Sequence, residues 1–308
     1  MSTFHGEKLY IGIAGASHAE KIELFARGFE KDAVIDLFAL QNYANRRKAD
    51  ASKAYSTSRV EPDLIEIKSG IDESGKIQDG EIRIVVKNTN FKSGDYKNLI
   101  TVPRPSHADY PAILRSKGEE NLSGGGKFSG RMTLPLVIAG GIAVQILGAR
   151  GITFVSKIVE IGGEYDPVLQ EKAIIAAKEK GDSVGGIIEV TAYNCPVGLG
   201  GALFDGLEST AASLAFAVPA VKGVEFGKGF EIARLKGSAA NDCYQIENGK
   251  VVTTSNNNGG IVGGMTNGMP VIMRAAIKPT PSISLEQDSV DLSTMQNTKL
   301  VIKGRHDA

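Results

Sequence analysis

Short runs in which apolar and polar residues alternate predict several β-strands along the chain. Residues 8–14 alternate in this way, and residues 65–67 mark a second strand. The pair Asp79-Gly80 is a hairpin signal, and it precedes the alternating residues 82–86. Further strands are expected at residues 187–192, 230–235, 250–254 and 271–277.

Four other segments have the apolar spacing of helices. Asp36 can cap a helix that continues to residue 47. Residues 133–149 are almost entirely apolar, which predicts a buried helix. The helix expected after Asp166 ends before Gly181, a residue typical of helix C-termini, and residues 207–215 form another helix.

The order of these elements favours one α+β domain. Strands and helices alternate irregularly over residues 1–308, and no Pro- or Ser-rich linker or simple repeat divides them. Two long apolar helices among many strands indicate helices packed between sheets.

Composition and charge exclude several classes of function. The chain has 35 Lys plus Arg and 35 Asp plus Glu, so no net field attracts nucleic acid or an anionic membrane. The longest apolar stretch, residues 134–149, is short for a membrane span. Cys195 and Cys243 have no metal-ligand spacing and fit a reducing compartment. We therefore expect a cytoplasmic protein that binds no metal, no nucleic acid and no membrane.

Three of the four histidines lie in loops beside small or charged residues. His18 follows Ser17, His107 lies between Ser106 and Ala108, and His306 precedes Asp307. A lone loop histidine is usually a surface residue. Next to Arg, Ser or Asp, it is a better candidate for proton transfer at an anionic substrate.

Basic and glycine-rich segments provide candidate anion sites. The basic residues Arg46, Arg47, Lys48, Lys53 and Arg59 form either a charged helix end or a clamp for phosphate and carboxylate, and both interpretations stay open. Residues 124–133 are a glycine-rich loop with basic and hydroxyl residues that leads into the apolar helix. Such a loop is either a natural anion site or a tight helix entry. Residues 255–268 are too rich in Asn and Gly for an ordinary turn.

Together these segments resemble the chorismate synthase family. Matching segments occur in order from near residue 9 to residue 308, and they also include residues 56–63, 181–186, 196–200 and 221–227. One such segment would be weak, but the ordered set is highly specific. The resemblance implies an α+β fold, a β-α-β sandwich with long helices packed between antiparallel sheets.

The resemblance also implies an activity. Family members are carbon–oxygen lyases that convert 5-enolpyruvylshikimate 3-phosphate into chorismate and phosphate by anti-1,4-elimination. They require reduced FMN although the reaction has no net redox change. NADPH is a candidate reductant, and an external source of reduced flavin is the alternative. A homotetramer is the implied assembly.

Three groups of residues match functional positions of the family. The implied catalytic residues are His18 for the leaving phosphate, His107 for the reduced flavin, and Asp307 for proton removal. The implied substrate-binding residues are Arg46, Arg47, Lys53 and Arg131, the last facing the substrate phosphate. The implied flavin-binding residues are Lys127, Phe128, Ser129, Ala239, Ala240, Gly263, Lys278, Pro279, Thr280, Pro281, Ser282 and Arg305.

Several positions depart from the family pattern. Ala16, Ala19, Lys127 and Met132 replace more usual residues, and we expect the family's final strand and helix to be missing. The alternative interpretation is therefore a non-catalytic or weakly active relative that binds flavin or substrate. Retention of His18, His107 and Asp307 favours an active lyase.

Overall fold

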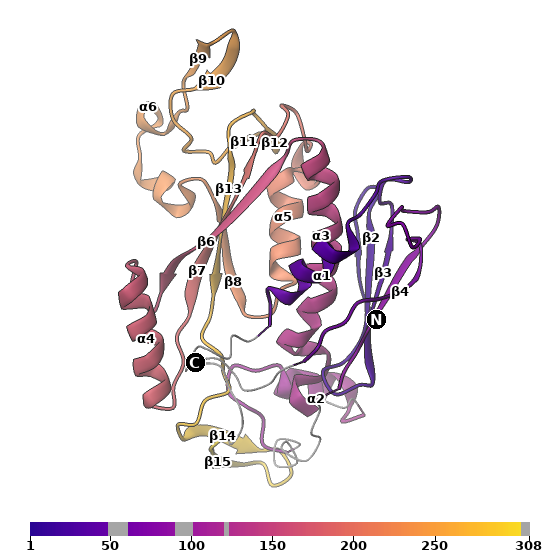
Figure 1. Ribbon diagram of the computed structural model, residues 1–308. Helices are drawn as coiled ribbons and strands as arrows, with labels where there is room; N and C mark the ends of the chain where they lie inside the picture. The colour runs from indigo at the N-terminus through magenta and orange to yellow at the C-terminus, as the bar shows by residue number, and fades with distance from the viewer. Residues whose placement is uncertain (49–60, 90–100, 120–122, 303–308) are drawn as a thin grey trace. The chain divides into compact units, whose positions relative to one another are not determined.

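The computed structural model describes residues 1–48, 61–89, 101–119 and 123–302 (Figure 1). The chain divides into two compact units. The first unit contains residues 1–146, 171–184 and 279–308, and the second contains residues 147–170 and 185–278. A single domain over residues 1–308 stays a prediction.

The described residues form short strands and helices throughout the chain. The strands are β1 (Ser2–His5), β2 (Tyr10–Gly15), β3 (Lys21–Arg27), β4 (Glu66–Ser69), β5 (Ile82–Lys87), β6 (Thr153–Ile161), β7 (Gly186–Tyr193), β8 (Val221–Phe226), β9 (Tyr244–Glu247), β10 (Lys250–Thr253), β11 (Ile261–Val262), β12 (Met265–Thr266), β13 (Val271–Ile277), β14 (Gln287–Asp291) and β15 (Gln296–Leu300). The α-helices are α1 (Leu37–Asn45), α2 (Asp109–Ser116), α3 (Leu134–Ala149), α4 (Pro167–Glu179), α5 (Leu207–Phe216) and α6 (Gly237–Ala240). The 3-10 helices are η2 (Ser123–Phe128), η3 (Gly130–Thr133), η4 (Leu203–Asp205) and η5 (Gly229–Arg234).

The first unit contains a five-stranded antiparallel sheet in the order β1-β2-β3-β5-β4. Along β3, Ile22, Leu24 and Ala26 are buried while the residues between them are not. Leu24 lies opposite Ile84 of β5, so apolar side chains pair across the strands on one face. This alternation gives the sheet one apolar face that a helix can cover.

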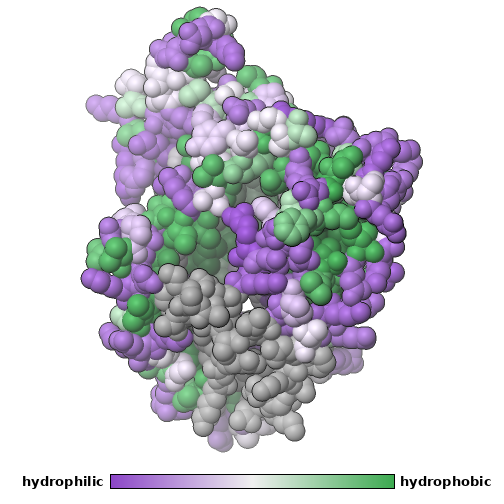
Figure 2. Space-filling view, viewed as in Figure 1, coloured by the Kyte–Doolittle hydropathy of each residue, from purple (hydrophilic) through white to green (hydrophobic). Residues whose placement is uncertain are grey.

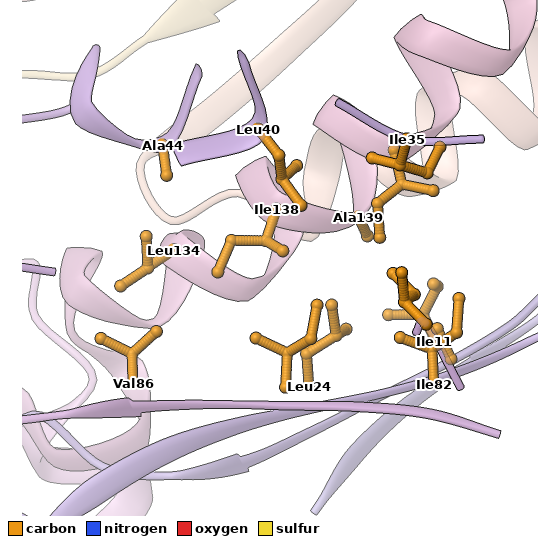
Figure 3. Close-up of a cluster of buried hydrophobic side chains, with 14 of the residues drawn as sticks. Ile11, Leu24, Ile35, Leu40, Ala44, Ile82, Val86, Leu134, Ile138 and Ala139 are labelled. Atoms are coloured by element: carbon orange, nitrogen blue, oxygen red, sulfur yellow. The ribbon is translucent and has the colours of Figure 1, made fainter. Parts of the chain in front are cut away.

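Helix α3 covers that apolar face. Figure 3 shows Leu134 and Ile138 of α3 lying over Val86 and Leu24 of the sheet, respectively, with Leu40 of α1 farther from the sheet. These five side chains are at most 2% exposed. The predicted buried helix is therefore confirmed for the part of α3 that lies in the first unit.

Gly141 of α3 allows α1 to approach closely. A Cβ at this position would lie 2.8 Å from Cδ1 of Leu40 and 3.0 Å from Cδ1 of Tyr43. The neighbouring Gly140 has open space, with no heavy atom within 4 Å of its Cβ position. The two glycines therefore form a matched pair in one helix.

We expect Gly141→Ala to destabilise the protein by about 1–3 kcal/mol, because the added methyl overpacks the α1–α3 contact. Gly140→Ala should leave the free energy of unfolding unchanged or raise it by up to about 1 kcal/mol through helix propensity. Urea unfolding of both variants measures the difference. Equal stability of the two variants would contradict the close packing at Gly141.

Local capping signals in the sequence are confirmed. The Asp36 carboxylate accepts a hydrogen bond from the Ala39 N–H at 2.9 Å, at the start of α1. The Asp166 carboxylate accepts one from the Val168 N–H at 2.9 Å, at the start of α4. Gly181 follows α4 with a φ of +72°, the left-handed conformation that glycine adopts without strain.

The second unit contains a four-stranded antiparallel sheet in the order β6-β7-β13-β8, with α5 next to β8. The predicted strand at residues 230–235 is wrong, because this segment forms the 3-10 helix η5 and the turn after it. Its backbone groups bond locally, with the Leu235 N–H donating to the Ile232 carbonyl at 3.1 Å. Phe230 is also exposed, so no partner strand shields the apolar pattern that suggested a strand. Helices and antiparallel sheets in both units confirm the α+β class.

Some apolar residues remain at the surface. Figure 2 shows hydrophobic residues reaching the surface among hydrophilic ones. On β6, Phe154, Val155 and Ile158 are all exposed. One helical stretch of the described residues, Gly130–Ala149, is long and apolar enough to cross a membrane by length and composition. Its first half lies in the core described above, as expected for a core helix.

Candidate active site

The His18 loop packs against the glycine-rich segment 124–126. The Ser17 N–H donates to the Gly126 carbonyl at 3.1 Å, and the Ser17 hydroxyl donates to the Gly124 carbonyl at 3.1 Å. Gly124 has a φ of +61°, and a Cβ there would lie 2.0 Å from Cε1 of His18. Glycine is therefore required at this position both by backbone conformation and by the contact with the imidazole.

Ser17 also orients the His18 ring. Its Oγ lies 3.0 Å from Nδ1 of His18. A hydroxyl has a single proton, and with that proton directed to the Gly124 carbonyl, Oγ accepts from Nδ1. In this arrangement the ring proton lies on Nδ1, and Nε2 is the ring nitrogen that Ser17 does not contact.

His107 belongs to a buried charged cluster at the start of α2. Its Nδ1 lies 2.6 Å from Oδ1 of Asp109. The Arg104 guanidinium donates to both Asp109 oxygens, from Nε at 2.7 Å and from Nη2 at 2.8 Å. Arg104 and Asp109 are both buried, and bidentate pairing of this kind is strong and geometrically specific.

The Asp109 carboxyl stays ionised in this cluster. Burial acts to raise its pKa, but hydrogen bonds and charge from Arg104 and His107 outweigh burial, and the pKa lies well below the ordinary value of 3.8. The carboxylate is therefore a permanent acceptor for the His107 ring at neutral pH.

This lowered pKa predicts how stability depends on pH. A carboxyl with a depressed folded-state pKa stabilises the protein fully above its unfolded-state pKa, and the contribution is lost as the pH falls through the folded-state value. The stability gap between the parent protein and Asp109→Asn should thus be widest at neutral pH and narrow below about pH 4. Urea unfolding at several pH values measures the gap. If the difference in unfolding free energy between the parent and Asp109→Asn did not change with pH, this would contradict the lowered pKa of Asp109.

Adjacent glycines bring the two histidines to one loop. Gly124 contacts the His18 ring, and a Cβ on Gly125 would lie 3.4 Å from Nε2 of His107. The rings come from segments that are far apart in the sequence, yet they flank two consecutive residues. The predicted pair His18 and His107 is therefore brought together, with Nε2 of His107 beside the loop.

Arg131 connects this region to a second charged cluster. Its Nε donates to Oδ1 of Asn88 at 2.5 Å, and Asn88 in turn donates to the Ala19 carbonyl of the His18 loop at 2.6 Å. Nη1 of Arg131 lies 2.8 Å from Oδ1 of Asp63, and Nη2 lies 4.0 Å from Glu61. Arg131 is buried and its charge is balanced by carboxylates, so contact with a substrate phosphate stays a prediction.

Two of the predicted anion-binding arginines, Arg47 and Arg131, share one carboxylate. Nη1 of Arg47 lies 3.3 Å from Oδ2 of Asp63, whose other oxygen faces Arg131. Nη2 of Arg47 also donates to the Gly130 carbonyl at 3.3 Å. Arg46 is exposed instead, with its guanidinium 5.0 Å from the centre of the Tyr43 ring. Asp63 thus holds Arg47 and Arg131 close together.

Predicted flavin-binding residues of the first unit lie at the same loops. Lys127 follows the three glycines, with its ammonium 5.3 Å from the centre of the Phe128 ring. The Ser129 hydroxyl accepts from the Arg131 N–H at 3.3 Å and caps η3. In the segment Pro279–Ser282, the Ser282 hydroxyl accepts from Nη1 of Arg104 at 3.2 Å, and the Thr280 carbonyl accepts from Ser183 at 2.8 Å.

In the second unit, the predicted residues occupy an Asn- and Gly-rich loop and its neighbours. The Asn257 side chain donates to the Ala239 and Ala240 carbonyls at 3.2 and 3.1 Å. Gly263 lies in the turn between β11 and β12 with a φ of +60°. Burial and the nearby charge of Lys222 lower the pKa of Lys278. Pro281 lies with its neighbours in the first unit, and Lys278 lies in the second.

Three predicted site residues, Lys53, Arg305 and Asp307, lie outside the described residues. The structure also adds residues that sequence reasoning did not assign, namely Arg104, Asp109, Asn88 and Asp63. The spacing His107-Ala108-Asp109 was a usable signal, because a carboxylate two residues from a loop histidine is a common partner. Asn88 and Asp63 carried no comparable signal.

The chain is similar to characterised proteins over nearly its whole length. A family model described as chorismate synthase matches residues 9–308. A chorismate synthase of Thermococcus kodakarensis is 38% identical over 325 residues, covering 98% of this chain and 90% of the relative. One from Dehalococcoides mccartyi is 40% identical over 331 residues, covering 100% and 90%. A crystal structure of a chorismate synthase matches with a TM-score of 0.70 and 27% identity, covering 89% of this chain and 85% of that one.

Proposed function

Because the chain belongs to the chorismate synthase family, we propose that it converts 5-enolpyruvylshikimate 3-phosphate into chorismate and phosphate by anti-1,4-elimination. The chain is an enzyme, a carbon–oxygen lyase acting on phosphates, with an α+β fold and a small-molecule substrate.

One observation carries the proposal: His18 and His107 flank the same glycine pair. The proposed elimination releases a phosphate, which leaves most readily as a protonated group, so an acid near the leaving group is required. His18, held through Nδ1 by Ser17, can deliver a proton from Nε2 when the ring is doubly protonated, and it is left as the neutral ring with its proton on Nδ1. His107 provides a second proton donor at the neighbouring loop. Asp307 is proposed to assist proton removal.

The residues at these loops fit reduced FMN. Gly125 and Gly126 have positive φ and carry no side chain, so that a planar ring or a phosphate can approach their backbone closely. Lys127 and the Ser129 and Ser282 hydroxyls provide donors suited to an anionic ligand. When bound, reduced FMN supplies an electron-rich ring that is returned unchanged, which accounts for the absence of net redox change.

The remaining proposed cofactor contacts are Phe128, Ala239, Ala240, Gly263, Lys278, Pro279, Thr280, Pro281 and Arg305. The proposed substrate contacts are Arg46, Arg47, Lys53 and Arg131, which supply forked or point-charge donors for a substrate with several negative charges.

A homotetramer is the proposed assembly. Exposed apolar side chains on β6, such as Phe154, Val155 and Ile158, support it, because monomers rarely expose contiguous apolar strands. Localisation in the cytoplasm is proposed from the biosynthetic activity. Size-exclusion chromatography with light scattering tests the assembly.

The deciding experiment is an anaerobic assay with reduced FMN and 5-enolpyruvylshikimate 3-phosphate, followed by chorismate absorbance. We expect chorismate and phosphate in equal amounts and no reaction with oxidised FMN. A second arm with oxidised FMN and NADPH tests whether the chain reduces its own flavin. Flavin or substrate binding without turnover would instead favour the rival proposal, a relative that has lost activity through Ala16, Ala19, Lys127 and Met132.

A further inference from the structure

We infer that Asp109 is a positioning residue that holds the ring proton of His107 on Nδ1, so that Nε2 is the nitrogen that exchanges protons at the site. This inference rests on the proposed function, in which His107 acts as an acid. It follows from counting the donors around one buried carboxylate.

Each Asp109 oxygen accepts two hydrogen bonds. Oδ2 faces the backbone N–H of Arg104 at 3.1 Å and Nε of Arg104 at 2.7 Å. Oδ1 faces Nη2 of Arg104 at 2.8 Å and Nδ1 of His107 at 2.6 Å. The first three groups are donors under all conditions, because arginine stays protonated in proteins. An ionised Asp109 with four donors is the consistent arrangement.

The contact at 2.6 Å decides which ring nitrogen is protonated. Without a proton on Nδ1, the lone pair of Nδ1 would face a carboxylate oxygen at 2.6 Å, which is repulsive. Nη2 of Arg104 also lies within hydrogen-bond distance of Nδ1, at 3.1 Å, but the same Nη2 makes a shorter contact of 2.8 Å to Oδ1 of Asp109. The shorter contact to a full negative charge dominates, and Nδ1 donates to Asp109.

Because Nδ1 of His107 donates to Asp109, Nε2 is the ring nitrogen that can exchange a proton with a ligand. Nε2 lies 3.4 Å from the position that a Cβ on Gly125 would take, so it faces the glycine-rich loop. Arg104 also donates to Ser282, which ties the cluster to a proposed flavin-binding segment. The ring is therefore fixed in both tautomer and direction before any ligand binds, which is how positioned acids act efficiently.

Asparagine at position 109 should reverse the tautomer. Its amide oxygen would stay with the N–H and Nε of Arg104, and its amide NH₂ would face Nδ1 of His107. Nδ1 must then accept, and the proton moves to Nε2. Loss of the negative charge also removes stabilisation of the protonated ring, as an Asp-to-Asn change does beside a catalytic histidine in serine proteases.

The test uses protein labelled with ¹⁵N at histidine, without ligands and at alkaline pH, where imidazoles are neutral. The chain has only four histidines, and His107→Gln assigns the His107 ring signals. The expected result is a protonated Nδ1 in the parent and a protonated Nε2 in Asp109→Asn. In the anaerobic assay, Asp109→Asn should lower kcat by about 10²–10⁴-fold with a KM within a few-fold of the parent.

Asp72→Asn is the matched control. The Asp72 carboxylate also accepts several hydrogen bonds, from Ser74, Lys76 and Gln78, but it lies in a turn outside the site. This variant should leave both the His107 signals and kcat unchanged. Asp109→Glu, which keeps a carboxylate, should retain the Nδ1 proton and restore part of kcat.

A proton on Nε2 in the parent would overturn the inference, even if Asp109→Asn does not fold. So would a loss of kcat in Asp109→Asn with the tautomer unchanged, because that result indicates a merely structural role. A tautomer that moves as expected in a protein that forms no chorismate would support the positioning by Asp109 and reject the proposed function.

Discussion

Replacing His18 by alanine is expected to lower kcat by about 10²–10⁴-fold while the protein keeps its fold. The ring is oriented by Ser17 and contacts Gly124, where an added Cβ would overlap it. The substitution therefore removes an oriented proton donor and leaves a small cavity beside Gly124. The anaerobic assay measures kcat when reduced FMN and substrate are both saturating. Circular dichroism tests whether the variant keeps its fold.

His5→Ala is the control for this variant. His5 lies in β1 and packs against the edge of the Tyr10 ring, with centroids 5.0 Å apart, and it has no contact with the glycine-rich loop among the described residues. The His5→Ala variant should therefore have the same kcat as the parent protein. Near-parental turnover in His18→Ala would instead show that another group protonates the leaving phosphate.

Removal of the Asp63 charge is expected to have the largest effect on stability. Asp63→Asn should lower the free energy of unfolding by about 3–5 kcal/mol, because breaking a buried ion pair leaves an uncompensated charge. The Asp63 side chain is 2% exposed, and its two oxygens face Arg47 and Arg131 at 3.3 and 2.8 Å. Both guanidiniums would lose their shared counter-charge, and Glu61 would be left 4.0 Å from Arg131 among the described residues.

Asp288→Asn provides the comparison at an exposed ion pair. Asp288 lies 2.6 Å from Lys299, but its side chain is 88% exposed, so solvent screens the pair. Urea unfolding should show no measurable change for this variant. If Asp63→Asn were as stable as Asp288→Asn, the buried cluster would contribute little to the fold. Substrate KM in the Asp63 variant reports separately on whether Arg47 and Arg131 bind the substrate.

Local elements could be predicted where the signal lies within a few residues. Asp36 and Asp166 cap helices because a carboxylate reaches an N–H two or three positions away, whatever the rest of the fold does. The strand β3 was not predicted, although Ile22, Leu24 and Ala26 alternate. Residues 230–235 were predicted as a strand and form a 3-10 helix, because a strand needs a partner that local sequence cannot specify.

Some features of the candidate site could likewise be predicted from the sequence, and others could not. The sequence identified His18, His107 and the glycine-rich loop, since imidazoles beside small and charged residues are recognisable within a short window. That the rings flank the same two glycines depends on how three separate segments pack. Asn88, which joins the His18 loop to Arg131, became visible only through contacts between residues far apart in the chain.

By itself, then, the sequence determined the α+β class, the helix boundaries set by caps, the family resemblance and the residue types that could carry the chemistry. Each of these depends on local spacing or on the order of motifs. Tertiary structure alone decided that Asp63 is shared by Arg47 and Arg131, and that Arg104 and His107 converge on Asp109. Charges placed in a buried cluster interact through distance and exclusion of water, and neither quantity can be calculated from positions along the chain.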